Sequence, residues 1–438
     1  MNYLPYSSQI YPQIQQLASP NIWKTLGMIT LYVFTLLRPI TVAFPTVKSI
    51  SILDIFGIGA SFLMLIGLLL NLRTIKISGL SVLIIFFIFY CLLSLFWHSE
   101  YREVSRTILP FIPFFLVNAV VEDIKDIQNL IFSLILGYFL PILGSVFLIA
   151  TGQSETMITG SFVERESGLS SGPHTLGHLM LFFSFTYGIY YLLNAQITHP
   201  RNLKSLAWHS YLFFLLLGSL LCIYKSYTRT VFVGSILFWF VYIWSWKKKW
   251  FLILSILIAL LTMTFYSSME TTFWQKKWGE RYVSHDLNTA SSGRLTIWHH
   301  NLKLFSGLSP TTKILGVGLG NELKALPDSY EKWIGSHNDY LSLLLVLGVL
   351  GLTLYLSMYL LISIKIIRAP IPQKMRGYFL IVIASVIIMN FLSNSYIVRF
   401  QMAQLFWFLI GMLYALSTLY SQEANKKDSQ EFQVVLPG

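Results

Sequence analysis

Long runs of apolar residues, separated by short polar segments, follow one another along most of the chain. A run of about 20 such residues is long enough for a helix to cross the hydrocarbon core of a bilayer. The pattern therefore predicts an all-α, polytopic transmembrane helical bundle of about 12 helices. These helices are expected near residues 25–44, 50–70, 77–97, 107–121, 128–150, 175–194, 206–224, 229–246, 250–267, 340–364, 377–395 and 401–420.

Composition supports this class of fold and excludes a water-soluble one. Of the 438 residues, 55% are hydrophobic and 11% are charged, whereas a soluble globular protein has about 25% charged residues. The formal net charge of +12 does not indicate a nucleic-acid partner, because basic residues of a membrane protein gather in cytoplasmic loops and near anionic headgroups. Membrane lipids are the partners that this composition predicts.

The orientation follows from the distribution of Lys and Arg between the loops. One set of loops carries more of these residues, including Lys247, Lys248 and Lys249, and is predicted to be cytoplasmic. Both termini then lie in the cytoplasm. The predicted segments are a cytoplasmic N-terminal segment 1–24, helices in 25–267, a large periplasmic loop 268–339, helices in 340–420 and a disordered cytoplasmic tail 421–438.

The large outer loop contains one stretch with helical periodicity. From Arg294 to Phe305, apolar residues recur at Leu295, Trp298 and Leu302, which predicts a short amphipathic helix. Such a helix either lies on the membrane surface or caps the helical bundle, and the pattern leaves both interpretations open.

Three residues with the chemistry of an anion site fall at the outer ends of predicted helices, namely Arg229, Arg294 and His337. A guanidinium is a planar fork of donors that fits a phosphate, and a helix start adds unpaired N–H groups and the positive end of a dipole. Arg399, between the last two helices, is a further candidate phosphate contact. A single interfacial arginine also serves as a headgroup anchor and a single histidine as a helix cap, so these interpretations stay open.

Arg38 lies near the outer end of the first predicted helix, and Asp54 near the outer start of the second. The arginine is expected either to extend its guanidinium to the interface or to pair with the aspartate inside the membrane.

Other motifs do not indicate a metal or a cofactor. The segment Gly316–Gly320 has the glycines of a nucleotide-binding loop, but no strand–helix unit surrounds it, so a tight turn is predicted. His174 and His178 are four residues apart, but the sequence offers no third ligand beside them. We therefore expect the protein to need neither a metal nor a cofactor.

Five segments carry a resemblance to a known family through their order along the chain. They are Arg165-Glu166-Ser167-Gly168-Leu169, Ser226 to Thr230, Gly293-Arg294 followed by Trp298, Leu315 to Asn321, and His337-Asn338-Asp339-Tyr340-Leu341. With these segments the chain resembles the O-antigen ligase and O-antigen (exopolysaccharide) polymerase superfamily of bacterial membrane glycosyltransferases. Residues 1–150 match it only as generic helices.

The resemblance implies a metal-independent lipid-linked oligosaccharide glycosyltransferase in the bacterial inner membrane, with a periplasmic active site. Its donor would be a glycan on undecaprenyl pyrophosphate. The equivalents of Arg229 and Arg294 would hold the pyrophosphate, Arg165 and Arg399 would also contact substrate, and the equivalent of His337 would act at the acceptor hydroxyl. A chain-length regulator is a further partner that the resemblance implies.

The acceptor distinguishes the activities within the superfamily. We favour a polysaccharide polymerase, because the segment from His337 to Leu341 has the form found in exopolysaccharide polymerase relatives. An O-antigen ligase, which attaches the glycan to lipid A–core, is the alternative. A flippase of lipid-linked oligosaccharides is a second alternative, from a different class.

Overall fold

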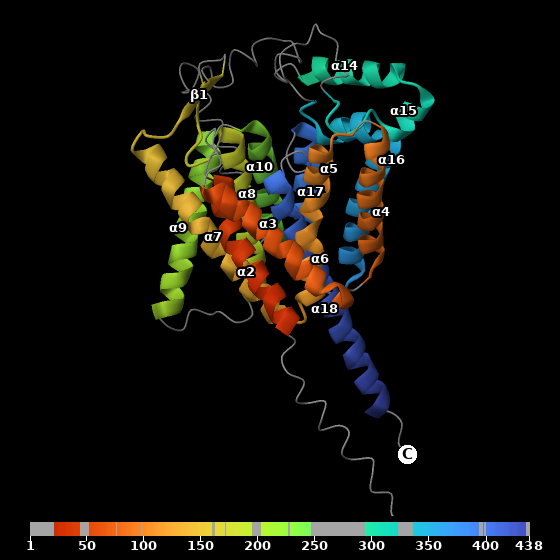
Figure 1. Ribbon diagram of the computed structural model, residues 1–438. Coiled ribbons are helices and arrows are strands. Elements are labelled where there is room, and N and C mark those ends of the chain that lie inside the picture. The colour runs from red at the N-terminus through yellow and green to blue at the C-terminus, as the bar shows by residue number, and fades with distance from the viewer. Residues whose placement is uncertain are drawn as a thin grey trace, which may run out of the picture.

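The computed structural model of the chain is a bundle of long helices that run side by side (Figure 1). It describes residues 22–43, 52–75, 77–97, 99–159, 163–170, 172–194, 203–226, 228–246, 294–322, 336–393, 397 and 400–434. Within these ranges, nine helices are long and apolar enough to cross a membrane. The prediction of an all-α polytopic bundle is thereby confirmed.

The described helices follow the predicted apolar runs in chain order. They are α2 (Ile22–Ala43), α3 (Ile52–Leu70), α4 (Gly79–Leu93), α5 (Tyr101–Ile108), α6 (Ile112–Val120), α7 (Ile124–Ala150), α8 (Pro173–Asn194), α9 (Leu203–Ser226), α10 (Arg229–Trp246), α14 (Arg294–Gly307), α15 (Pro310–Leu315), α16 (Asp339–Arg368), α17 (Gln373–Leu392) and α18 (Phe400–Val434). Short 3₁₀ turns follow α3, α4 and α5, at Leu72–Thr74, Ser94–Trp97 and Leu109–Phe111. The predicted helix 250–267 lies outside the described residues.

Helices α14 and α15 lie across one end of the bundle, which we call the α14 end (Figure 1). Because successive long helices alternate in direction, α8, α10, α16 and α18 begin at this end, and α2, α7, α9 and α17 finish there.

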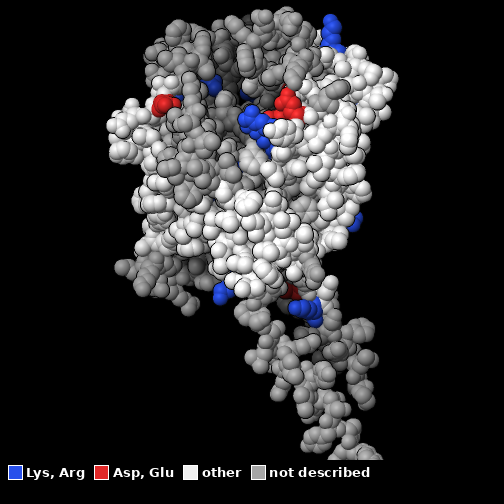
Figure 2. Space-filling view, viewed as in Figure 1, with Lys and Arg blue, Asp and Glu red and all other residues white. Residues whose placement is uncertain are grey.

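At the opposite end, Lys24 of α2 forms an ion pair of 2.5 Å with Glu122, which lies between α6 and α7. Figure 2 shows the same division, since charged side chains gather near the two ends and a broad uncharged band covers most of this face between them. Such a band is suited to lipid.

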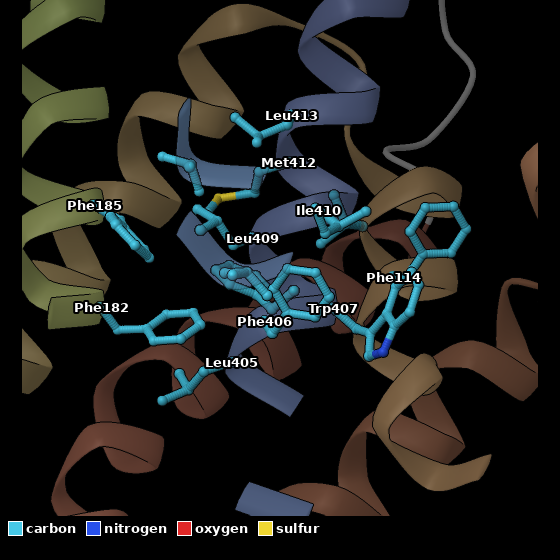
Figure 3. Close-up of a cluster of buried hydrophobic side chains, with 14 of the residues drawn as sticks. Phe114, Phe182, Phe185, Leu405, Phe406, Trp407, Leu409, Ile410, Met412 and Leu413 are labelled. Carbon is cyan, nitrogen blue, oxygen red and sulfur yellow. The ribbon is translucent and has the colours of Figure 1, made fainter. Parts of the chain in front are cut away.

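Aromatic side chains around α18 form the centre of the bundle (Figure 3). The ring of Trp407 lies 4.4 Å from that of Phe111 and 6.3 Å from that of Phe114, measured between centroids. On the other side of α18, Phe182 and Phe185 extend towards it from α8 (Figure 3). All five of these residues are at most 3% exposed. Helix α18 is therefore packed on both sides by buried aromatic side chains and lies at the centre of the bundle.

The glycine-rich loop that follows α15 packs against a kink in α16. Gly348 has φ 66° and ψ −171°, which interrupts the helix. The carbonyls freed above it accept hydrogen bonds from the loop, Val317 N–H to Leu345 at 2.9 Å and Gly318 N–H to Val346 at 2.9 Å. Tyr90 of α4 donates to the carbonyl of Leu347 at 2.8 Å. The glycine-rich segment 316–320 is thus a tight turn, as predicted. Its hydrogen bonds hold the segment after α15 against α16.

Replacing Gly348 with alanine is expected to destabilise the folded protein. A backbone conformation of this kind, which is populated almost only by glycine, costs an L-residue about 1–3 kcal/mol, and a Cβ at this position would meet the carbonyl oxygen of Ile314 at 2.2 Å. Thermal unfolding in detergent would show a lowered midpoint. Gly377, in α17, has no atom within 4 Å of such a Cβ, so Gly377→Ala is the matched control and should leave the midpoint unchanged or raise it. Equal midpoints for the two variants would contradict the kink.

The end of the chain and the loop between α7 and α8 differ from the predicted pattern. Helix α18 continues to Val434, whereas a disordered tail was expected from residue 421, because no proline or glycine interrupts the chain between Gly411 and Pro437 and polar residues with good helical propensity can extend an established helix. A hairpin of two strands, β1 (Thr156–Thr159) and β2 (Val163–Glu166), lies in the predicted loop between α7 and α8.

Candidate functional site

Three of the predicted site residues lie at or beside helix starts at the α14 end. Arg229 is the first residue of α10, Arg294 is the first residue of α14, and His337 comes two residues before α16 begins at Asp339. The first N–H groups of a helix have no partner within it and carry the positive end of its dipole. Several such helix starts at one end of the bundle make that end suited to an anion.

The start of α10 is fixed to the start of α8. The hydroxyl of Thr228 donates to the carbonyl of Pro173 at 3.1 Å, and Gly177 leaves space beside Thr228 and Ser226, whose side-chain atoms would lie 3.3 and 2.9 Å from an added Cβ. Thr228 and Ser226 are both buried. The backbone from which Arg229 extends is therefore held rigidly, and the side chain of Arg229 itself lies outside the description.

His337 occupies an unusual backbone conformation. Its φ of 49° is positive, and among residues other than glycine this conformation is uncommon, with histidine one of the more tolerant types. The next residue, Asn338, caps α16, because its side-chain oxygen accepts from the N–H groups of Tyr340 and Leu341 at 3.0 and 3.1 Å. His337 is partly buried and keeps some exposed surface, so a ligand at the α14 end can reach it.

Ser336, immediately before His337, is held from two sides. From α14, the indole N–H of Trp298 donates to its carbonyl at 3.0 Å and the amide of Asn301 donates to its hydroxyl at 3.0 Å. From the loop after α15, the carboxylate of Glu322 accepts its backbone N–H at 3.0 Å and its hydroxyl. These hydrogen bonds fix the backbone immediately before the histidine.

Arg294 joins α14 to the end of α17. Its guanidinium donates to the carbonyl of Leu392, the last residue of α17, where the helix leaves carbonyls without partners. The ring of Trp298 lies 5.2 Å from that of Phe391. The predicted helix over 294–305 is thus present and caps the bundle, with Ile297 and Asn301 buried against it.

Asp339 fixes the connection between α17 and α18. Its side chain is fully buried, and one carboxylate oxygen accepts the N–H of Ile397 at 3.3 Å. Arg399, the fourth arginine of the predicted site, follows shortly after and lies outside the described residues.

Arg165 lies in β2, opposite Met157 of β1. The hairpin is fastened to the α14 end through the residues that follow it, since Ser154 accepts the N–H of Gly168 at 3.0 Å and Ser145 of α7 accepts the N–H of Leu169 at 3.1 Å. The segment therefore belongs to the same end of the bundle as Arg294 and His337.

Arg38 does not extend to the interface, and that expectation was wrong. Only 3% of the residue is exposed. Its Nη1 lies 3.4 Å from the hydroxyl of Thr41, and the guanidinium carbon lies 5.4 Å from the centroid of Phe400, the first residue of α18. The packing of α2 against the neighbouring helices covers the side chain. The side chain of Asp54 lies outside the described residues.

The sequence did not identify the residues that hold His337 in place. Glu322 and Asn301 are polar residues that form hydrogen bonds with Ser336, the neighbour of the histidine. In a chain with few charged residues, a carboxylate often has a specific partner. Glu322 could have been proposed as a site residue for that reason.

The described residues contain no cluster of three or more His, Cys, Asp or Glu that could hold a metal ion. His174 and His178 lie in the first two turns of α8, and His178 is buried. The groups at the α14 end include cations, hydroxyls and carboxylates, which can bind an anion and hydroxyl groups.

Comparison with known families gives one finding. Residues 213–356 match the family model described as O-antigen ligase. The matched segment extends from α9 into α16 and contains Arg229, Arg294 and His337, whereas Arg165 and Arg399 lie outside it. No curated protein matches the chain. The resemblance to the O-antigen ligase and polymerase superfamily is confirmed by this match.

Proposed function

We propose that this chain transfers a glycan from undecaprenyl pyrophosphate to an acceptor hydroxyl at the periplasmic face. Two findings support the proposal: a segment of the chain matches the O-antigen ligase family model, and the described helices form a multi-pass membrane bundle. The family match supports a membrane glycosyltransferase, and the donor, the side of the membrane and the acceptor belong to the proposal. The observation that carries it is the gathering of helix starts with Arg229, Arg294 and His337 at the α14 end.

The proposed chemistry needs few groups. A diphosphate is a good leaving group, and two guanidiniums stabilise the negative charge that develops on it, most strongly where water is excluded. The acceptor is a sugar hydroxyl that must lose a proton. An imidazole has an ordinary pKa near 6.5, which suits a general base at neutral pH. In this proposal Arg229 and Arg294 bind the diphosphate and His337 takes the proton.

The fold offers a surface that suits the proposed carrier lipid. The carrier lipid would lie along the uncharged band of the bundle (Figure 2) with its diphosphate at the α14 end. Arg165 and Arg399 are proposed to contact the substrate from the hairpin and from the start of α18. A chain-length regulator remains a proposed partner on the strength of the family resemblance alone.

The activity that we favour within the family is that of a polysaccharide polymerase, and ligation to lipid A–core is the alternative. A deletion strain distinguishes the two. Loss of a polymerase leaves single repeat units attached to the final acceptor, whereas loss of a ligase leaves finished polymer on the carrier. The proposal predicts single repeat units.

A lipid-linked oligosaccharide flippase is a candidate from another class. It would require a charged cavity at the middle of the membrane, whereas Arg165, Arg229 and Arg294 belong to elements at the α14 end. The buried Arg38 lies in the last two turns of α2, which finishes at that end. Purified protein in vesicles with lipid-linked donor tests the two functions. Bond formation supports the transferase, and movement of the donor across the bilayer without a new glycosidic bond would overturn it.

Removing divalent metal ions is expected to leave the transfer rate unchanged. The proposed mechanism assigns the charge of the diphosphate to guanidiniums and the proton to an imidazole, so it requires no metal ion. The measurement is the initial rate of transfer by purified protein with and without a chelator. Complete loss of activity that returns when a divalent ion is restored would contradict this mechanism.

A further inference from the structure

A cavity of about 270 Å³ opens beside the loop that carries His337. It lies between α5, the turn that follows α15, the first two turns of α16 and the connection before α18. Its polar lining comes from Glu100, Glu103, Arg106 and Thr107 on the α5 side and from Glu322 and Ser342 opposite; Leu319, Leu343, Val346 and Ile397 supply apolar walls. Pockets for drug-sized ligands occupy about 300–1,000 Å³, so this cavity has room for roughly one sugar ring.

The lining of the cavity combines acceptors, donors and apolar surface. Glu103 and Arg106 face each other at 2.9 Å, one turn apart on α5, and both side chains keep exposed surface, 29% and 46% respectively. A carboxylate beside a guanidinium offers an acceptor and a donor to neighbouring hydroxyl groups, and charged partners make such hydrogen bonds strong. The apolar walls suit the C–H faces of a sugar ring. Figure 2 shows acidic and basic side chains together on this face near the α14 end.

The cavity shares a wall with the His337 loop. One oxygen of the Glu322 carboxylate accepts from Ser336, the neighbour of His337, and the other accepts from the hydroxyl of Ser342 in the first turn of α16. Ser336 therefore lies between Glu322 on the cavity side and α14 on the other side, where Arg294 begins the helix. Ser336 thus connects the wall of the cavity to α14, the helix that begins with Arg294.

We propose that this cavity binds the sugar residue that carries the accepting hydroxyl, and that Glu103 and Arg106 are its principal hydrogen-bonding partners. The inference rests on the proposed transferase function and adds the acceptor subsite to it. A base between two subsites can take the proton from an alcohol on one side while the leaving diphosphate stays on the other. The donor glycan has the same hydroxyl chemistry, and the experiment below separates the two sources.

Steady-state kinetics of the purified full-length chain, with lipid-linked donor and a glycan acceptor varied independently, test this assignment. Glu103→Gln and Arg106→Gln are each expected to raise KM for the acceptor between about tenfold and a hundredfold, the effect of losing a hydrogen bond to a charged group. KM for the donor should not change. Arg106→Lys, which keeps the charge without the planar fork, should fall between Arg106→Gln and the unchanged protein.

Arg102 is the matched control, because it is an exposed arginine on the same helix and does not line the cavity. Arg102→Gln should leave both KM values and the thermal midpoint unchanged. If Glu103→Gln lowers the midpoint, Thr107→Val tests the same cavity with a smaller change. Unchanged acceptor KM in folded variants, or a rise in donor KM instead, would overturn the acceptor subsite.

The two levels of the proposal fail in different ways. If the unchanged protein forms no glycosidic bond from a lipid-linked donor, the proposed function is wrong and the acceptor subsite falls with it. If the unchanged protein transfers glycan and the cavity variants have its kinetics, the transferase stands and only the acceptor subsite is wrong.

Discussion

Replacing His337 with alanine is expected to reduce glycan transfer by about a hundredfold to ten-thousandfold, the range for loss of a general base. The partly exposed His337 lies beside the start of α16, on a backbone fixed by Ser336 and Asn338. No other group is proposed to accept the hydroxyl proton. The measurement is the single-turnover rate of purified protein with saturating donor and acceptor, because this rate reports the chemical step rather than binding.

The control for His337 is another histidine of the same layer. His299 is an exposed residue of α14, so His299→Ala should transfer glycan at the original rate. His337→Ala should still bind donor with its original affinity and unfold at a similar temperature. A single-turnover rate within a few-fold of the original protein would exclude His337 as the base.

Loss of either proposed phosphate arginine should produce the second large effect. Arg229→Ala and Arg294→Ala each remove a charged contact, which costs about 2–5 kcal/mol, or roughly thirty- to several-thousand-fold in kcat/KM for the donor. The effect should fall on the donor and leave KM for the acceptor unchanged. Arg294→Lys should recover part of the lost activity, since a lysine keeps the charge but not the bidentate geometry.

A structural role for Arg294 is separable from this binding role. Its guanidinium also donates to the carbonyl of Leu392, so Arg294→Ala is expected to lower the thermal midpoint slightly. Lys303, an exposed cation on the same helix, provides the control, and Lys303→Ala should change neither stability nor donor KM. If folded Arg229→Ala and Arg294→Ala keep a near-normal kcat/KM for the donor, these residues do not bind the diphosphate.

Most of the helical architecture could be predicted from the sequence, because apolar runs of membrane-spanning length leave the backbone few alternatives. The break in α16 could not. Residues 340–364 are a continuous apolar run, and the kink at Gly348 exists because carbonyls of this helix bond to Val317 and Gly318. Such a contact joins segments that only the folded chain brings together.

Only those site residues that lie at or beside a helix start could be predicted from the sequence. Arg229, Arg294 and His337 were identified because each lies at or beside a predicted helix start, amphipathic in the case of Arg294, and topology assigns helix starts to one side or the other. Glu322 and Asn301 were not identified, since their importance comes from hydrogen bonds to Ser336 across 14 and 35 residues of sequence. Hydropathy carries no information about such partners.

The sequence also did not predict that the side chain of Arg38 is buried. Its position near the end of a membrane helix suggested a side chain that reaches water. Whether a long side chain does so depends on the neighbouring helices, and here the start of α18 covers it, with Phe400 over the guanidinium.

The central claim is that Arg229, Arg294 and His337 surround one carrier diphosphate. An experimental structure of the full chain in a lipid disc with undecaprenyl pyrophosphate tests it most directly. The account predicts the diphosphate at the α14 end, with both guanidiniums in hydrogen-bonding distance of its oxygens and the imidazole facing the adjacent sugar position. A diphosphate bound at the opposite end of the bundle, or bound without either arginine, would contradict the account.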